Sequence, residues 1–343
     1  MHVFVTGGTG FIGSHSVAAL HRAGHKVRLF VRNGKAVLPA LGPLDVQPGD
    51  VEVVTGDVTD EESVRRGLEG CDAVLHAASV YSFDSRHHKL MTEVNAKGTE
   101  IVLGAAKRAG IDPIVYVSSF AAMLPTKGQP LSGDLPVGRP RERYMATKAE
   151  AERIARRYQD EGTPVVITYP MSTVGPHDPH LGDQTSRVRS VLLGLMPIWP
   201  LGGFPVGDVR DVAALHASVM QPGQGPQRLL APATYLSTPQ YVRTLRRVTG
   251  RMLPTVFMPA IGVMPVGVLT QAVQRFLPFH IPAEYGAIYT CLCNPKLDAN
   301  AGAAPSRSVE ESMTDTVRWL YETGKLSRRT AGKVAKDVVS VTG

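Results

Sequence analysis

Short apolar runs alternate with helix-forming segments through the first half of the chain. The run at residues 2–6 is β-branched and aromatic, which is typical of a buried strand. The same pattern recurs until residue 170. It predicts strands at 2–6, 26–31, 51–54, 73–77, 114–117 and 165–169, and helices at 14–23, 96–109 and 144–161. Such alternation predicts an α/β fold with a doubly wound parallel sheet.

The pattern changes after residue 176. Segments 190–207 and 252–274 carry no charged residue and contain several prolines. The second segment is long enough for a membrane span, but its three prolines and polar side chains argue against a continuous spanning helix. We expect 252–274 to form the packed interior of a smaller C-terminal lobe. A second, compatible interpretation is an apolar substrate pocket with a face on a membrane surface.

These changes of pattern predict the domain organisation. Residues 1–176 form the sheet domain, to which 206–236 returns. Residues 177–205 and 237–323 form the substrate-binding lobe. Residues 324–343 are polar and basic and are expected to be a solvated tail.

Composition excludes several classes of function. The chain has 343 residues, a hydrophobic fraction of 43% and a net charge of +7, which fits a globular protein that attracts an anionic cofactor. No basic run indicates nucleic acid. Cys291 and Cys293 are too close and too few for a zinc site, and His177 and His180 lack clustered partners, so no metal is expected. The cysteine usage and an initial strand at residue 2 predict a cytoplasmic protein without a signal peptide. The oligomeric state stays open, with a homodimer as one option.

A glycine-rich turn follows the first strand. Gly7, Gly10 and Gly13 have the spacing GxxGxxG between a strand and a helix. Gly7 permits the tight turn, Gly10 lets the backbone approach a phosphate, and Gly13 lets the helix lie close to the strand. The N–H groups and dipole of the helix favour a pyrophosphate. The motif predicts a dinucleotide-binding Rossmann domain, although an ordinary glycine turn would have the same letters.

The end of the second strand bears on the choice of cofactor. Enzymes that use NAD usually place a carboxylate there for the ribose hydroxyls. This chain has Arg32, with Lys35 close by. A guanidinium binds a 2′-phosphate that a carboxylate would repel, so NADP(H) is favoured over NAD(H). The alternative is that Arg32 is a solvated loop charge.

Two hydroxyls and a tyrosine–lysine pair form the candidate catalytic group. Ser118 and Ser119 end a strand, where ligands bind in a parallel sheet. Tyr144 and Lys148 are spaced i, i+4 among helix formers and therefore lie on one face. A nearby ammonium lowers the pKa of a phenol toward working pH. The pattern predicts hydride transfer with its own proton donor, although such a pair alone commonly has one core and one solvated member.

Taken together, these motifs resemble the extended branch of the short-chain dehydrogenase/reductase superfamily. The matching residues span about residues 1–216. They are TGGTGFIG at 6–13, Gly56-Asp57-Val58, His76-Ala77-Ala78, Asn95, Val117-Ser118-Ser119, YxxxK at 144–148, Pro170, Val174-Gly175-Pro176 and Asp208-Val209-Arg210-Asp211-Val212-Ala213. The resemblance is specific for the fold and the cofactor and poorly specific for the substrate.

The resemblance implies roles for individual residues. Tyr144 is the general acid/base, Lys148 is its partner and a ribose ligand, and the second serine, Ser119, holds the substrate oxygen. Asp57 and Val58 correspond to adenine contacts, and His76 to scaffold. The residues expected at the cofactor are Gly7, Gly10, Phe11, Ile12, Gly13, Arg32, Lys35, Asp57, Val58, Ala77, Ala78, Ser79, Asn95, Lys148 and Pro170.

Two departures from the family pattern narrow the reaction. Sugar-nucleotide dehydratases carry Asp-Glu after the catalytic hydroxyl, where this chain has Phe120 and Ala121. Nucleotide-sugar epimerases often carry an arginine seven residues before the Asp of the DVA-like motif, where this chain has Phe204. Phe120 and Phe204 are therefore expected to contact the substrate. The replacement arginines that could restore a diphosphate clamp are Arg187, Arg189 and Arg210.

These observations favour one function over two alternatives. We expect an NADP(H)-dependent oxidoreductase that interconverts a ketone and a secondary alcohol on an apolar small molecule, similar to the dihydroflavonol reductase and 3β-hydroxysteroid dehydrogenase branch. The first alternative is a nucleotide-sugar 4-epimerase. The second is a sensor that binds NADP without turnover. The sequence does not identify the substrate or the physiological direction.

Overall fold

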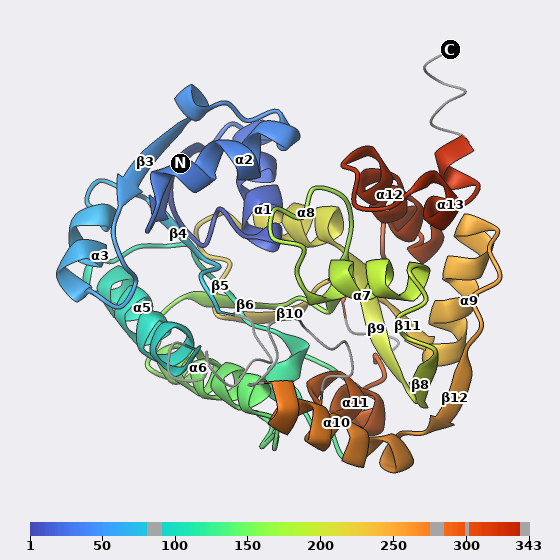
Figure 1. Ribbon diagram of the computed structural model, residues 1–343. Coiled ribbons are helices and arrows are strands. Elements are labelled where there is room, and N and C mark those ends of the chain that lie inside the picture. Colours follow the sequence, from blue (N-terminus) through green and yellow to red (C-terminus); the bar gives the residue numbers. More distant parts are fainter. Residues whose placement is uncertain (81–90, 275–284, 299–301, 337–343) are drawn as a thin grey trace.

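The computed structural model describes residues 1–80, 91–274, 285–298 and 302–336 (Figure 1). Its strands are β1 (His2–Thr6), β2 (Lys26–Val31), β3 (Val51–Thr55), β4 (Ala73–His76), β5 (Ile114–Val117), β6 (Val165–Tyr169), β7 (Ser172–Val174), β8 (Ile198–Leu201), β9 (Gly203–Asp208), β10 (Gln227–Leu230), β11 (Thr234–Ser237) and β12 (Val256–Pro259). Its α-helices are α1 (Phe11–Arg22), α2 (Val37–Leu41), α3 (Glu61–Leu68), α5 (Gly98–Arg108), α6 (Arg143–Asp160), α7 (Asp183–Leu192), α8 (Val209–Ser218), α9 (Thr238–Thr249), α10 (Ala260–Gln274), α11 (Tyr285–Cys293), α12 (Val309–Glu322) and α13 (Arg328–Ala331). A π-helical turn, η5 (Glu93–Lys97), precedes α5.

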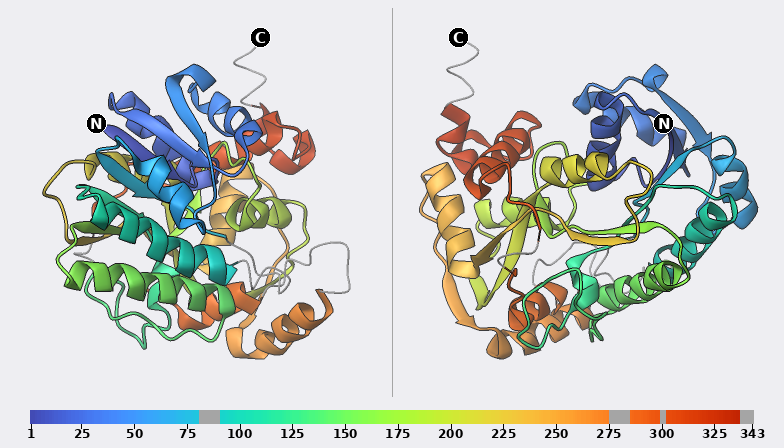
Figure 2. Two further views of the ribbon diagram at one scale, coloured as in Figure 1. Left: turned by 90° about the vertical axis from the view of Figure 1, so that its left-hand side faces the viewer. Right: turned by 180° about the vertical axis from the view of Figure 1, so that it is seen from behind.

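The main sheet is parallel and doubly wound. In the described part of the chain it has seven strands in the order β10-β6-β5-β4-β1-β2-β3. Helices α1 and α8 pack together, as do α3, α5 and α6 (Figure 2). Successive side chains of β1 enter different cores: Val3 and Val5 join a cluster with Val17 of α1, and Phe4 joins one with Val102 of α5. Helices therefore cover both faces of the sheet, which confirms the predicted α/β fold.

The order of the strands reverses beside β1. The chain first adds β2 and β3 on one side of β1 and then crosses over to β4, β5 and β6 on the other. A crevice opens at such a reversal, outside the carboxyl ends of the strands, and it is where ligands bind in doubly wound sheets. The glycine turn follows β1, and Ser118 and Ser119 follow β5, so both motifs lie at this edge.

The C-terminal lobe has a core of its own. Strands β7, β9 and β11 form a small sheet, and β8 pairs with β12. Trp199 and Phe204 pack on Tyr241 of α9 with ring centroids 5.4 and 5.6 Å away. Between β9 and β11, the chain leaves the lobe to form α8 and β10, and β10 pairs with β6 in the main sheet.

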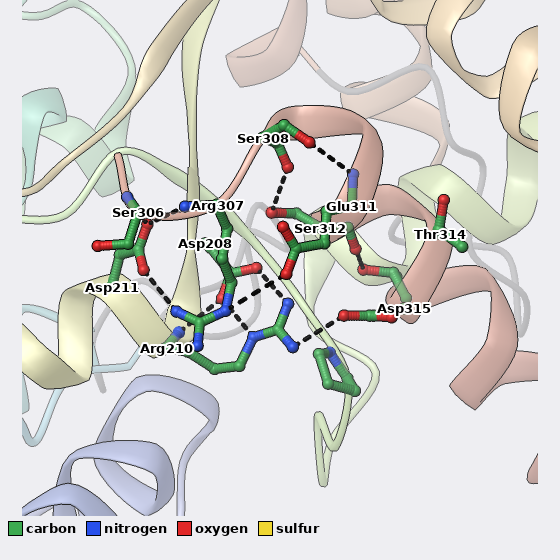
Figure 3. A network of polar contacts seen from close by, with 12 residues as sticks. Asp208, Arg210, Asp211, Ser306, Arg307, Ser308, Glu311, Ser312, Thr314 and Asp315 are labelled. Atoms are coloured by element: carbon green, nitrogen blue, oxygen red, sulfur yellow. Dashed lines mark hydrogen bonds and ion pairs between the residues drawn. The ribbon is translucent and has the colours of Figure 1, made fainter. Parts of the chain in front are cut away.

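A polar network ties α8 to the segment around α12 (Figure 3). The guanidinium of Arg210 donates to Asp208 at 2.7 Å and to Asp315 of α12 at 2.8 Å. The guanidinium of Arg307 donates to the buried carboxylate of Asp211 at 2.6 Å. Because α8 also packs on α1, these ion pairs join the C-terminal residues to the sheet half of the molecule.

Two predictions about the C-terminal half are wrong. The described part of the segment expected as a solvated tail includes α13 and buries Leu326, Val334 and Ala335 in the core of the lobe, because its apolar positions complete that core. The segment 252–274 does not form a packed interior. It forms β12 and α10 along one side of the lobe, and Met252, Ile261 and Leu269 are 90%, 74% and 65% exposed. In the part of the chain that the structure describes, no helix has the length and apolar character that a membrane span requires.

Candidate functional site

The glycine turn has the geometry of a phosphate cradle. Gly7 has a φ of +72°, and a Cβ placed on it would lie 2.6 Å from the backbone of Ala77 and Ala78. A Cβ on Gly13 would lie 2.1 Å from the carbonyl oxygen of Gly7. Gly10 caps α1 without a side-chain hydrogen bond, which leaves N–H groups at the start of the helix for an anion. The turn therefore fits a dinucleotide pyrophosphate.

One end of the adjoining cavity lies beside the ends of β2 and β3. Arg32, Asp57 and Val58 line it there, and Arg32 is exposed. Burial acts to raise the pKa of Asp57, but hydrogen bonds from the backbone and hydroxyl of Thr59, with Arg32 and Lys97 nearby, hold it below its usual value. A carboxylate and a guanidinium are thus available for an adenosine with or without a 2′-phosphate. Lys35 is exposed and is not among the residues that line the cavity.

The wall after β4 is built of small residues that a buried amide holds in place. Ala77, Ala78 and Ser79 line the cavity, whereas Asn95 does not. Asn95 accepts hydrogen bonds from the Ser79 hydroxyl at 3.0 Å and from the backbone N–H of Val80 at 2.8 Å. Its amide donates to the Val80 carbonyl and, at 3.0 Å, to Thr147 of α6. Asn95 therefore positions the wall of the cavity from behind.

Ser119, Tyr144 and Lys148 line the same cavity. Ser119 follows β5 and accepts a hydrogen bond from the Ala121 N–H at 3.2 Å. Tyr144 lies in the first turn of α6, whose N-cap, Glu142, accepts hydrogen bonds from the N–H groups of Tyr144 and Met145 at 3.0 and 2.8 Å. The ammonium of Lys148 donates to the Val117 carbonyl at 3.4 Å. The cap and the strand end thus bring the three side chains to one place.

Burial is the largest influence on the pKa values of Lys148 and Tyr144. Burial lowers the pKa of Lys148 to about 8, although the carboxylate of Glu152, one turn further along α6, acts to raise it. Burial also raises the pKa of Tyr144 well above its usual value; Glu142 and Asp183 add to this, while a hydrogen bond with Ser119 opposes it. The expected lowering of the tyrosine pKa by the lysine is not found; burial is the largest influence and raises the pKa. Tyr144 is therefore protonated at neutral pH.

The remainder of the cavity lies between the sheet and the lobe. The whole cavity, including the part beside the glycine turn, has a volume of about 730 Å³. Phe120 and Phe204, the two residues expected to contact the substrate, both line it, with Pro170 at the end of β6. Further apolar lining comes from Met145, Met171, Leu181 and Ala287. These side chains give an apolar surface next to the hydroxyls of Ser119 and Tyr144, whereas the lobe also contributes polar lining residues such as Gln184, Thr185 and Thr290.

The three arginines considered for a diphosphate clamp do not converge. Arg187 lines the cavity, with its guanidinium 5.6 Å from the centre of the Phe204 ring. Arg189 donates to the carbonyl of Lys325, away from the cavity. Arg210 is paired with Asp208 and Asp315. Arg187 is therefore the one arginine from the lobe among the lining residues that the structure describes.

Sequence reasoning missed several residues of the site. Glu142 could have been found, because an acidic side chain at the start of a helix is stabilised by the helix dipole. His180 lines the cavity, and its Nε2 lies 3.1 Å from the Thr9 carbonyl oxygen. Asp183 at the start of α7 also lines it. The loop before α7 brings these residues in from a region without a recognisable motif. Within the described ranges, no three metal-ligating side chains come together.

Comparison with known proteins decides the family. Residues 3–229 match the model of the NAD dependent epimerase/dehydratase family. The chain belongs to this family. The match includes the glycine turn, both serines, Tyr144 and Lys148, and it supports a nicotinamide cofactor for this epimerase/dehydratase-family protein.

Curated relatives indicate the branch of the family. Sterol demethylase protein B from Methylococcus capsulatus is 29% identical over 337 residues, which are 95% of this chain and 100% of that protein. A 3 beta-hydroxysteroid dehydrogenase/Delta 5-->4-isomerase from Mycobacterium tuberculosis is 35% identical over 161 residues, 44% of this chain and 41% of that protein. These relatives confirm the predicted resemblance and the prediction of an NAD(P)-dependent oxidoreductase.

Solved structures confirm the fold. A nucleoside-diphosphate-sugar epimerase from Pseudomonas aeruginosa superposes with a TM-score of 0.73 and 21% identity, over 95% of this chain and 99% of that one. At this identity, the likeness concerns the architecture and not the substrate.

Proposed function

We propose that this protein is an NADP(H)-dependent oxidoreductase that interconverts a ketone and a secondary alcohol on an apolar small molecule. The observation that carries the proposal is the composition of one cavity. Ser119, Tyr144 and Lys148 line it next to the glycine turn. Phe120, Phe204 and Ala287 add apolar wall, beside the polar residues at the start of α7. A bound nicotinamide supplies the hydride in such a site.

The chain's own residues supply the proton and the orientation. Tyr144, kept protonated by its burial, donates its proton to the carbonyl oxygen of the ketone as the carbon is reduced. The Ser119 hydroxyl donates a hydrogen bond to the same oxygen and holds it near the phenol. The ammonium of Lys148 stabilises the tyrosinate that forms and binds the ribose. In the opposite direction, the tyrosinate takes the proton of the alcohol.

The preference for NADP rests on Arg32. This guanidinium lies at the exposed end of the cavity, where the adenosine ribose is expected. A 2′-phosphate there would gain a charge-assisted hydrogen bond. Asp57 also lines this end, and the hydrogen bonds from Thr59 hold its carboxylate toward its own loop. The arrangement supports NADP over NAD.

The proposal of an apolar substrate rests on the small number of arginines that the lobe places at the cavity. A diphosphate buried without paired cations is costly, and Arg187 is the one lobe arginine among the described lining residues. Apolar rings gain about 25 cal/mol for each Å² removed from water. The name of the relative from Methylococcus capsulatus, a sterol demethylase protein, points the same way. The nucleotide-sugar 4-epimerase stays the alternative, since Arg187 could contact one phosphate.

The surroundings of the protein are also part of the proposal. The exposed apolar side chains of β12 and α10 support contact with a membrane surface, and we place the protein in the cytoplasm. Flotation with liposomes checks the first point: retention of the protein in the aqueous fraction at every lipid composition would contradict it. A homodimer remains a prediction that sedimentation can test.

A panel of substrates tests the reaction. We expect NADPH to be consumed with steroid-like and other apolar cyclic ketones, and Tyr144→Phe to slow this consumption by roughly 10²- to 10⁴-fold. Turnover of UDP-glucose without net change in the cofactor would favour the epimerase. Tight binding of NADPH without turnover of either class would favour the sensor.

A further inference from the structure

A second cavity adjoins the reaction cavity inside the lobe. Its volume is about 270 Å³, and it lies between β8, α10 and α11. Arg187, Phe204 and Ala287 line both cavities and therefore form the boundary between them. The second cavity shares no residue with the glycine turn or with Ser119, Tyr144 and Lys148. The second cavity therefore lies outside the regions assigned to the candidate catalytic residues and the cofactor.

The lining of this second cavity is almost entirely apolar. Its walls include Trp199 and Val263, and Arg187 at the boundary is the one charged residue among its described lining residues. A polar ligand would find few partners for its hydrogen bonds there. Pockets that hold a complete ligand usually have about 300–1,000 Å³, so a cavity of this size suits part of a larger ligand.

The boundary between the cavities includes one small side chain. The Phe204 ring is held by Tyr241 at 5.6 Å on the lobe side and by the guanidinium of Arg187 at 5.6 Å. Ala287 on α11 is the smallest of the three boundary residues. At the outer end, the partly exposed apolar side chains of Ile198, Met258 and Val266 line the cavity. An apolar chain that passed Ala287 would leave Arg187 at the boundary and then lie among apolar side chains.

We infer that the second cavity is a subsite for a flexible apolar chain of the substrate. The inference rests on the proposed function: the ketone lies at Ser119 and Tyr144, and an alkyl or isoprenoid chain attached to the same molecule extends past Ala287 into the lobe. Specificity then comes mainly from chain length, because the subsite offers apolar area and little directional bonding. Each methylene buried there raises kcat/KM by up to about fourfold, the factor that corresponds to about 0.8 kcal/mol.

A series of ketones tests the subsite. We would measure kcat/KM with NADPH for 2-alkylcyclohexanones whose side chains have two to ten carbons. The value should rise with chain length and then level off when the cavity is full. If the enzyme reduces these ketones but kcat/KM is the same from two carbons onward, the subsite is wrong and the proposed reaction stands.

A substitution at Gly262 tests whether the dependence of kcat/KM on chain length arises in this cavity. Gly262 lines it, and a Cβ there would meet no atom within 4 Å, so Gly262→Phe introduces a ring at the lining without a clash at its Cβ. The ratio of kcat/KM for the ten-carbon and two-carbon ketones should fall at least tenfold. Val268→Phe adds the same ring on the same helix, at a residue that is 54% exposed and does not line the cavity, and should keep the wild-type ratio. Equal ratios in Gly262→Phe and the wild type would overturn the inference.

A binding measurement separates this inference from the proposed function. Titration of n-decanol into protein saturated with NADP+ needs no turnover. We expect Gly262→Phe to weaken the affinity for decanol at least tenfold and Val268→Phe to leave it unchanged. If no ketone is reduced but this pattern is found, the proposed function fails and the subsite stands. If decanol binds equally to all three proteins, the subsite is wrong.

Discussion

The sheet half and the C-terminal lobe meet at one cavity, but they use charged residues in different ways. In the sheet half, Arg32 and Lys148 face the cavity. In the lobe and its connections, Arg189, Arg210 and Arg307 are used to hold segments together. The sheet half therefore offers cations to an anionic cofactor, whereas the lobe contributes one arginine, Arg187, to the described lining together with apolar and other polar side chains. In the proposed function, chemistry and selectivity come from different halves of the molecule.

The first prediction concerns the proton donor. Tyr144→Phe keeps the ring that packs in the cavity and removes only the transferable proton. Turnover should fall by roughly 10²- to 10⁴-fold, the contribution of general acid catalysis, while the affinity for NADPH stays near the wild-type value. Steady-state kinetics and a fluorescence titration of NADPH measure the two quantities.

Loss of both activity and cofactor affinity in this variant would mean that the phenol is part of the cofactor site and not only of the chemistry. The division of roles between Tyr144 and the glycine turn would then be wrong. Melting of the variant at the wild-type temperature is the control for its fold.

The second prediction concerns the cations of the sheet half. Arg32→Ala should weaken NADPH binding about ten- to a hundredfold, because a charge-assisted phosphate contact is lost, and should leave NADH binding nearly unchanged. Lys35→Ala is the matched control, since Lys35 is exposed nearby but does not line the cavity. Equal affinity of the wild type for NADH and NADPH would contradict the assignment.

The contrast between the halves also explains what the sequence could predict. The sheet half is built from local patterns: a strand, a glycine turn and a helix follow one another, and Tyr144 and Lys148 are four residues apart on one helix. Such spacings are visible in the sequence, so the fold could be predicted and the candidate catalytic group could be named. The lobe is built from distant segments, since β8 pairs with β12 and β9 pairs with β11. No local spacing records those pairings.

Residues 252–274 illustrate the limit. The sequence pattern of an uncharged segment is the same whether its side chains are buried or exposed. In the structure, many side chains of this segment are exposed. The tail shows the reverse case, because Leu326 and Val334 lie among charged residues and are nevertheless buried. The role of Arg187 at the boundary of two cavities could not be seen from its neighbours in sequence.

The third prediction tests how firmly the halves are joined. Arg307→Ala removes a guanidinium from the buried carboxylate of Asp211, which keeps hydrogen bonds from the N–H groups of Ser306 and Arg307. The free energy of unfolding should fall by about 1–2 kcal/mol, measured by urea denaturation. The control is Arg247→Ala, whose partner Glu310 is on the surface, with an expected change within about 0.5 kcal/mol. Equal effects of the two substitutions would show that the network of Figure 3 does not hold the lobe.

The last and smallest expected effect concerns Lys148. Its pKa is about 8 because burial lowers it from 10.5, and the nearby carboxylate of Glu152 acts in the opposite direction. The ammonium is therefore present below about pH 8 and is lost as the pH rises. Tyr144 keeps its proton in this range because burial raises its pKa. In the reducing direction, kcat/KM should thus fall above about pH 8, and this limb should report Lys148.

Glu152→Gln assigns that limb. The substitution removes the charge that raises the pKa of Lys148, while the amide oxygen can still accept hydrogen bonds from Tyr169 and Arg156, as the carboxylate does at 2.6 Å from each. The alkaline limb should therefore move to lower pH. Glu150→Gln, at an exposed position of the same helix, should leave the limb in place. If the pH of the alkaline limb is the same in Glu152→Gln and the wild type, a group other than Lys148 sets it. The positive charge on which the reaction depends would then not be the buried ammonium of the sheet half.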